Sequence, residues 1–194
     1  MARPRKAEDP ARWPEPCSRC GQHHQTVVRW PDGGVCTYCY QQAKRTRGRC
    51  VCGHDGVLPG IVDEQPACRQ CSGVRLNIDC RSCGAEDELY DGGRCWGCVL
   101  GATVDRFLTN PKTGVMAAEL VPMATALKAM KRSNSGLTWI RQKHVTKFLQ
   151  DLASAPRSTH EVLDELPKSH RHDFVRGLLV EHGTLPRRDI YRAR

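Results

Sequence analysis

Apolar residues in the second half of the chain recur every three to four positions, which is the period of one helix face. In the stretch 137–153, for example, Ile140, Val145, Phe148 and Leu149 fall on one side. The pattern predicts five helices, at about 98–109, 116–132, 137–153, 158–166 and 170–182. A turn is expected at Asn134-Ser135-Gly136. We therefore expect an all-α domain over residues 101–194.

The first half of the chain has a different pattern. Of the 37 Leu, Ile, Val and Phe residues, residues 1–100 hold only 14. So few aliphatic side chains cannot offset the chain entropy of folding through a hydrophobic core alone. The same segment contains all 12 cysteines, after a charged, proline-containing stretch at 1–16 that we expect to be a flexible arm. The cysteines must therefore supply the missing stabilisation.

The cysteines form six close pairs, and these pairs fall into three units at 17–39, 50–71 and 80–98 within residues 17–100. Four cysteines in two close pairs are typical of a tetrahedral zinc site. The expected ligands are Cys17, Cys20, Cys36, Cys39, Cys50, Cys52, Cys68, Cys71, Cys80, Cys83, Cys95 and Cys98. Disulfides or a thioredoxin-like redox pair do not account for a threefold repeat of four cysteines. Cross-braced ligation between neighbouring units stays open, although the regular repeat favours sequential units.

In each unit a glycine follows the first, or leading, cysteine pair, and we call this pair with its glycine the knuckle. Sequence compatible with a helix follows the second, or trailing, pair in the first and third units. Knuckle, hairpin and helix together predict three tandem zinc-ribbon or treble-clef units. Four thiolates close the coordination shell of zinc, so the three Zn²⁺ ions are expected to be structural rather than catalytic. His23, His24 and His54 lie near ligands but are interpreted as neighbours of the sites and not as ligands.

The net charge of +9 is unevenly distributed. With each thiolate counted as −1 and each zinc as +2, residues 1–100 carry about −4 and residues 101–194 carry +7.

The helices expected at 158–166 and 170–182 resemble a helix-turn-helix in spacing, although plain packing of two helices explains them equally well. The candidate nucleic-acid contacts are Arg141, Lys143, Lys147, His170, Arg171, Arg176, Arg187 and Arg188. Further basic clusters are Lys44-Arg45-x-Arg47-x-Arg49 and Lys128, Lys131 and Arg132.

The segments LVPMATALKAM, LTWIRQKHVTKFLQDLA, THEVLDELP and VRGLLVEHGTLPRRD resemble a region of bacterial site-specific recombinases of the tyrosine (integrase) family. The resemblance covers roughly residues 17–190. It implies an array of CxxC zinc units in front of a helical, DNA-engaging core-binding domain. The family's catalytic domain needs a His-x-x-Arg box, which is absent here, and Tyr191 has no base beside it in the sequence. The resemblance therefore implies a module without the catalytic residues.

The sequence contains no apolar stretch long enough to span a membrane and no secretory signal, so we expect a cytoplasmic protein. The resemblance implies a bacterial protein, associated with the nucleoid if it binds DNA. The expected function is non-catalytic binding of duplex DNA in recombination, mobile-element biology or transcriptional control. Two alternatives stay open: a zinc-ribbon adapter that binds proteins, and an RNA-binding zinc protein. No membrane or small-molecule partner is expected.

Overall fold

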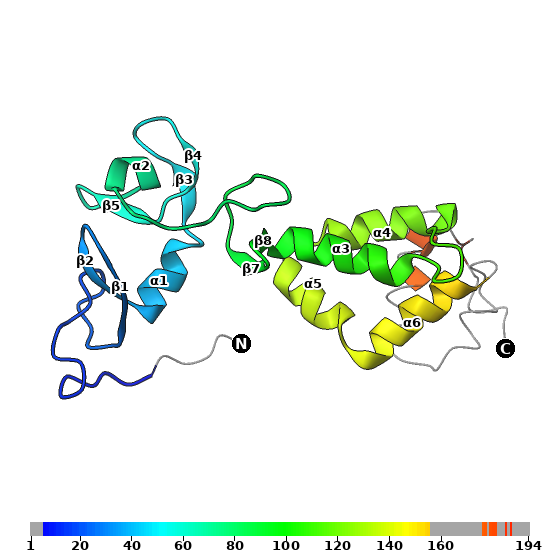
Figure 1. Cartoon of the computed structure of the whole chain (residues 1–194), viewed down its shortest axis with the longest axis horizontal. Coiled ribbons are helices and arrows are strands. Elements are labelled where there is room, and N and C mark those ends of the chain that lie inside the picture. Colours follow the sequence, from blue (N-terminus) through cyan, green and yellow to red (C-terminus); the bar gives the residue numbers. More distant parts are fainter. Residues whose placement is uncertain (1–5, 156–175, 178, 182–184, 186, 188–194) are drawn as a thin grey trace. The chain divides into compact units, whose positions relative to one another are not determined.

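The computed structural model describes residues 6–155, 176, 177, 179–181, 185 and 187 (Figure 1). The chain divides into two compact units, Met1–Gly93 and Arg94–Arg194. The helix expected at 158–166 and most of the helix expected at 170–182 lie outside the described residues.

The first zinc unit is a hairpin followed by a helix. Strand β1 (Thr26–Trp30) pairs antiparallel with β2 (Gly33–Cys36), and α1 (Thr37–Ala43) follows directly. The turn between the strands needs glycine at position 33, where φ is 112° and an added Cβ would lie 2.9 Å from the Cβ of Ser18. Tight packing of the hairpin on the cysteine knuckle thus depends on that glycine.

The described part of the N-terminal arm, residues 6–16, lies against the first zinc unit. The Asp9 N–H donates to the carbonyl of His23 at 3.1 Å, and the His23 N–H donates to the Glu8 carboxylate at 3.1 Å. The His23 ring also bonds the Trp13 carbonyl at 2.9 Å. Hydrogen bonds to the zinc unit thus hold this stretch, which the sequence alone predicts as part of a flexible arm.

The second zinc unit consists of two short hairpins and one helical turn. Strand β3 (Arg47–Arg49) pairs with β4 (Asp55–Val57), and β5 (Gly60–Val62) pairs with β6 (Gln65–Ala67). Helix α2 (Arg69–Ser72) ends at Gly73, which adopts the left-handed conformation with φ of 67°. In the third zinc unit β7 (Leu89–Asp91) pairs with β8 (Arg94–Cys95).

The cores of the zinc units are small. One consists of Trp30, Val35, Ala43 and Val74, and another of Leu58 and Ala67 together with the ligands Cys50 and Cys68. Cores of this size bury too little apolar surface to hold the chain by themselves. The metal-stabilised, zinc-ribbon-like character expected from the sequence is therefore confirmed.

Within residues 96–154 of the second unit, four α-helices share one apolar core. They are α3 (Trp96–Leu108), α4 (Val121–Lys128), α5 (Ser133–Ile140) and α6 (Lys143–Ser154), with a 3₁₀ turn, η1 (Ala118–Leu120), before α4. Helix α3 packs against α4, α5 and α6. The core includes the fully buried residues Leu100, Leu108, Leu120, Met123, Leu127, Leu137, Ile140, Leu149 and Leu152.

Three of the expected element boundaries are wrong. The helix expected at 116–132 is shorter, because a 3₁₀ turn precedes α4 and α4 ends at Lys128. The helix expected at 137–153 is broken at Arg141 and Gln142, where Gln142 adopts an extended conformation with ψ of 130° and begins α6. The turn expected at residues 134–136 lies instead inside α5. Gly136 is buried there, and a Cβ at this position would lie 3.2 Å from the Leu100 side chain, so the glycine allows close packing on α3.

Candidate metal centres and nucleic-acid interface

The twelve cysteines form three tetrahedral groups, each made of two consecutive pairs. In every group the four sulfurs lie within 4.8 Å of one another. The members are Cys17, Cys20, Cys36 and Cys39, then Cys50, Cys52, Cys68 and Cys71, then Cys80, Cys83, Cys95 and Cys98. The sequential arrangement is thus observed and cross-braced ligation is not.

The sulfur spacing matches zinc. Tetrahedral Zn–S bonds of about 2.3 Å place neighbouring sulfurs about 3.8 Å apart. The Cys20 and Cys36 sulfurs lie 3.9 Å apart, and the Cys52 and Cys68 sulfurs lie 3.7 Å apart. A disulfide requires about 2.05 Å, and all twelve cysteines are free. The groups therefore fit three structural zinc ions with closed coordination shells.

The three trailing pairs share one local geometry. Cys36, Cys68 and Cys95 each precede the first helical residue of α1, α2 and α3, with extended backbones of nearly equal φ and ψ. The N–H groups of Cys36 and Cys68 donate to the sulfurs of Cys17 and Cys50 at 3.3 and 3.4 Å. Main-chain donors that point at a sulfur stabilise the thiolate that zinc binds.

These contacts shift the cysteine pKa values. Burial raises the pKa of Cys17, but N–H groups from Cys36 and the knuckle outweigh it and lower the pKa to about 6. The N–H groups of Cys68 and Cys52 likewise lower the pKa of Cys50 to about 6. In contrast, the crowded neighbouring thiols raise the pKa of Cys71 to about 12. Four mutually repelling thiolates therefore need a cation between them.

The three nearby histidines bond other groups. The His23 ring bonds the Trp13 carbonyl, and buried His24 meets the Tyr38 ring edge-on at 5.1 Å between centroids. The His54 Nε2 lies 2.9 Å from the Glu86 carboxylate. None of them belongs to a four-sulfur group, as the sequence interpretation expects.

An acidic segment, Glu86–Glu88, follows the third knuckle and pairs with cations of the preceding units. Glu86 accepts from Arg69 at 2.7 Å, and its other oxygen lies 2.9 Å from His54 Nε2 and 3.1 Å from the Val57 amide. Arg69 also forms two bonds of 2.8 Å with Asp79. The Glu86 carboxylate thus joins the second zinc unit to the third knuckle.

The same acidic segment neutralises most of the basic run at 44–49. Glu88 pairs with Lys44 at 3.3 Å and Arg45 at 3.0 Å, and Asp87 pairs with Arg47 at 3.1 Å. The sequence marks this run as a possible phosphate contact. Three of its four cations already have carboxylate partners, so the run offers a polyanion much less charge than its sequence indicates.

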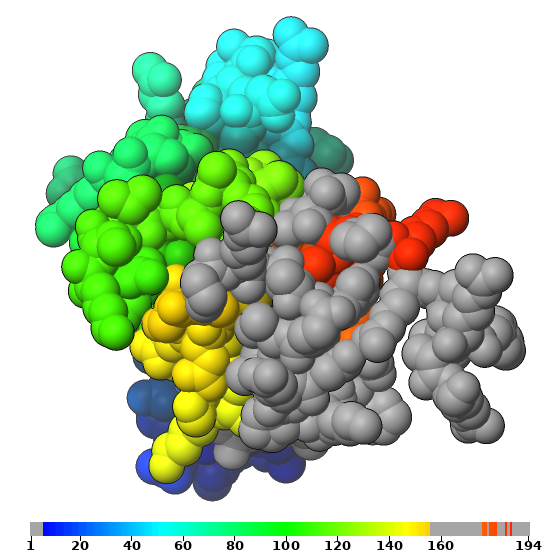
Figure 2. Space-filling model, turned by 90° about the vertical axis from the view of Figure 1, so that its right-hand side faces the viewer, coloured from blue at the N-terminus to red at the C-terminus, as the bar shows by residue number. Residues whose placement is uncertain are grey.

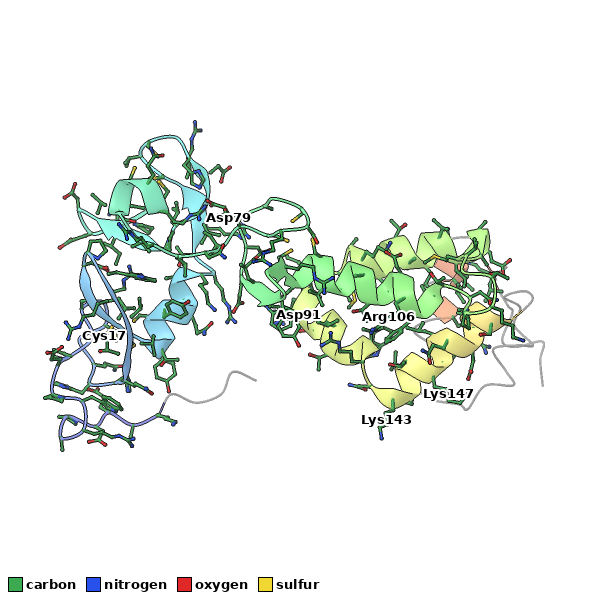
Figure 3. All side chains as sticks on the ribbon, viewed as in Figure 1. Cys17, Asp79, Asp91, Arg106, Lys143 and Lys147 are labelled. Atoms are coloured by element: carbon green, nitrogen blue, oxygen red, sulfur yellow. The ribbon has the colours of Figure 1, made fainter. Side chains whose placement is uncertain are left out.

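The second unit keeps its positive charge. Its residues 94–155 include nine lysines and arginines but only three carboxylates. We call the exposed basic side chains at the two ends of α5 and on the first turns of α6 the basic surface: Lys131, Arg132, Arg141, Lys143, His144 and Lys147. Lys143 and Lys147 lie one turn apart on α6 (Figure 3), and Lys147 also pairs with Asp151 at 2.8 Å. The atoms of α6, yellow in Figure 2, reach the surface of this unit.

The structure brings together only some of the candidate nucleic-acid residues. Arg141, Lys143 and Lys147 lie within the basic surface. Arg176 is half-buried and Arg187 is exposed, but His170, Arg171 and Arg188 lie outside the described residues. The pairing between the acidic segment and residues 44–47 was not predicted from the sequence, although the two short runs of opposite charge are visible in it.

No helix in the described part of the chain is long and apolar enough to cross a membrane. No protein-family model, curated protein or solved structure that we compared matches the chain.

Proposed function

We propose that this zinc protein binds duplex DNA through the basic surface of its second unit and has no catalytic role. The observation that carries the proposal is the uneven distribution of net charge between the two units. In the zinc units, carboxylates neutralise Lys44, Arg45, Arg47 and Arg69. In the second unit, cations outnumber carboxylates three to one over residues 94–155.

The arrangement around α6 supports contact with phosphates. Lys143 stands at the first position of the helix and Lys147 one turn later, while Arg141 lies in the break before it. The N-terminal end of a helix carries partial positive charge, which adds to that of the lysines. Lys131 and Arg132 are exposed between α4 and α5 and belong to the same basic surface, at the other end of α5. Such contacts fix a protein on duplex DNA without reading its sequence.

The resemblance to tyrosine-family recombinases supports the same assignment. It covers the zinc array and the helical region and leaves out the catalytic domain. From this resemblance we infer a role in recombination, mobile-element biology or transcriptional control. We also infer that the zinc units are treble clefs and that the helical region is an all-α domain similar to a core-binding domain. Closed four-sulfur sites leave zinc no open position for water, so the metal stabilises and does not catalyse.

A salt titration of duplex affinity tests the proposal. We expect binding at low salt, with log affinity falling linearly with log salt. Replacing Lys131 and Arg132 with Ala removes two contacts and reduces the slope by about 1.8. The control Lys112→Ala removes an exposed cation from the loop after α3 and leaves the slope nearly unchanged. Absence of binding at low salt would refute DNA binding.

Two alternative functions have their own tests. An RNA-binding protein would prefer structured RNA in direct competition with duplex DNA. A protein adapter is favoured by one observation, the neutralised zinc region, because each zinc with four thiolates carries a net charge of −2 that opposes a polyanion. Failure to bind either nucleic acid at low salt would favour the adapter.

A further inference from the structure

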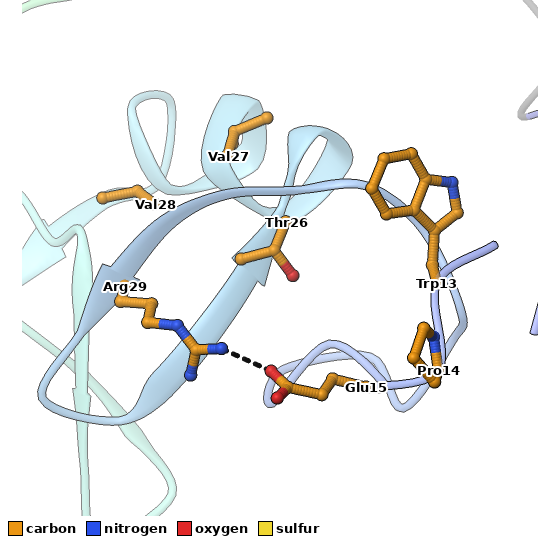
Figure 4. Close-up of a pocket in the computed structure, with 7 residues that line it drawn as sticks. All are labelled: Trp13, Pro14, Glu15, Thr26, Val27, Val28 and Arg29. Carbon is orange, nitrogen blue, oxygen red and sulfur yellow. Dashed lines mark hydrogen bonds and ion pairs between the residues drawn. The ribbon is translucent and has the colours of Figure 1, made fainter.

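The outer edge of strand β1 lies beside two cavities. The first, about 520 Å³, lies between the N-terminal arm and the strand and is lined by Trp13, Pro14, Glu15 and residues 26–29 (Figure 4). The second, about 470 Å³, is lined by residues of α1 and the segment 75–77. Val27 and Val28 line both cavities, so both adjoin the same stretch of β1.

Among the described residues no strand lies beside this edge of β1, which carries a bulge between Thr26 and Val28. The sheet has two strands, and β2 occupies the other side of β1. On β2 the far edge is covered, because the Ser18 N–H donates to the Gly34 carbonyl at 2.9 Å. The arm runs near β1, but Pro14 and Pro16 have no N–H to donate. Backbone groups on the outer edge of the regular stretch Val28–Trp30, after the bulge, are thus left for another chain.

We propose that the β1 edge binds an extended peptide segment of a partner protein as an added strand. Side chains of a strand alternate between its two faces. Successive side chains of the added strand would therefore enter the cavity beside Trp13 and the cavity beside Tyr40 in turn. Main-chain hydrogen bonds supply affinity in this mode of recognition, and the pockets for alternate side chains supply selectivity.

The surrounding charge selects the chemistry of the peptide. Val27 is 46% exposed and presents an apolar surface at the edge. Arg75, which lines the second cavity, is exposed, and no ion pair joins it to another residue that the structure describes. Arg29 at the first cavity pairs with Glu15, and both side chains are exposed (Figure 4). Because Arg29 is already neutralised, Arg75 is the cation that selects the partner, whose segment is therefore apolar in its centre and acidic at the end that lies near Arg75.

The test uses the zinc-loaded full chain and a capped synthetic peptide, Glu-Val-Thr-Val-Thr-Val-Glu. Isotope-edited NMR should show the largest shift changes at the amides of β1, with a Kd between about 1 μM and 1 mM. Amides on the outer edge should also exchange more slowly with solvent when the peptide is bound. A peptide N-methylated at alternate amides keeps its side chains but cannot pair, and it should bind at least about ten-fold more weakly.

Two protein variants localise the site. Val27→Lys places a charge on the edge, and Trp13→Ala removes one cavity wall; each should weaken binding about ten-fold or more. The matched control Val115→Lys charges an exposed valine of the second unit and should bind like the wild type. Zinc content shows that each variant is folded. No binding up to about 1 mM, equal binding of the N-methylated peptide, or shift changes confined to the second unit would overturn the proposal.

Discussion

Arg69 donates a hydrogen bond of 2.7 Å to Glu86, linking two zinc sites through residues that adjoin their ligands. Arg69 follows the ligand Cys68, and Glu86 lies three positions after the ligand Cys83. The side chains are only 29% and 18% exposed, so the pair is partly shielded from solvent. The zinc units of the first compact unit are therefore joined by side-chain pairing as well as by the chain.

Replacing Glu86 with Gln should destabilise the zinc region by about 1–3 kcal/mol, because Arg69 and His54 lose their shared carboxylate in a partly buried site. Denaturant unfolding of the zinc-loaded protein at neutral pH measures the change. Asp55→Asn is the matched control, since Asp55 is exposed and forms no ion pair with any described residue. Equal stability of the two variants would contradict the assigned role.

The effect of Glu86 should depend on pH. Burial raises the pKa of Glu86, but hydrogen bonds from Arg69 and His54 outweigh it and hold the pKa below its ordinary value. A carboxyl group with a lowered folded pKa stabilises fully above its unfolded pKa, about 4.3, and loses this contribution as pH falls further. The stability difference between wild type and Glu86→Gln should therefore be constant near neutrality and shrink below about pH 4.3. A difference that grows on acidification would contradict this sign.

Removal of zinc by a chelator should unfold residues 17–98 but leave α4, α5 and α6 largely helical. The core of the second unit contains no zinc ligand, whereas Cys50 and Cys68 form half of one zinc-unit core. Amide hydrogen exchange with and without chelator distinguishes the regions. Simultaneous loss of protection throughout both regions would show a single cooperative core instead.

Two glycines in the second unit should respond oppositely to replacement by alanine. At Gly136 a Cβ would lie 2.9 Å from the Met130 sulfur and 3.2 Å from Leu100, so crowding should lower stability by about 1 kcal/mol. At Gly101 the nearest atom is 4.0 Å away, and Ala should raise stability by about 0.5–1 kcal/mol through helix propensity. Thermal unfolding of the two variants provides the comparison. A stabilised Gly136→Ala would show that α5 and α3 do not pack as closely as described.

The zinc ligands were predictable because their geometry is local. Each knuckle positions two sulfurs within a few residues, so spacing alone identifies all twelve cysteines. The break between α5 and α6 was not predictable from apolar spacing, since Ile140 and Val145 both belong to the core and the pattern continues across it. Gly136 was misread as a turn for a related reason, because its packing against Leu100 is a tertiary contact.

Charge was harder to interpret than metal ligation. The run from Lys44 to Arg47 has the sequence of a phosphate-binding segment, and its neutralisation depends on Asp87 and Glu88, some 40 positions away. Side-chain pairing between distant segments leaves no periodic signal in a sequence. Comparing runs of opposite charge along the chain was the only means of anticipating it.

The salt dependence of duplex affinity in two double variants tests the proposed DNA contact most directly. The proposal predicts that Lys131→Ala with Lys143→Ala, two exposed lysines that form no ion pair with any described residue, reduces the slope of log affinity against log salt by about 1.8. It predicts almost no change for Arg45→Ala with Arg47→Ala, whose exposed ion pairs contribute little stability and whose charges are already neutralised. A larger loss of slope in the second variant, with zinc content intact in both, would contradict the account.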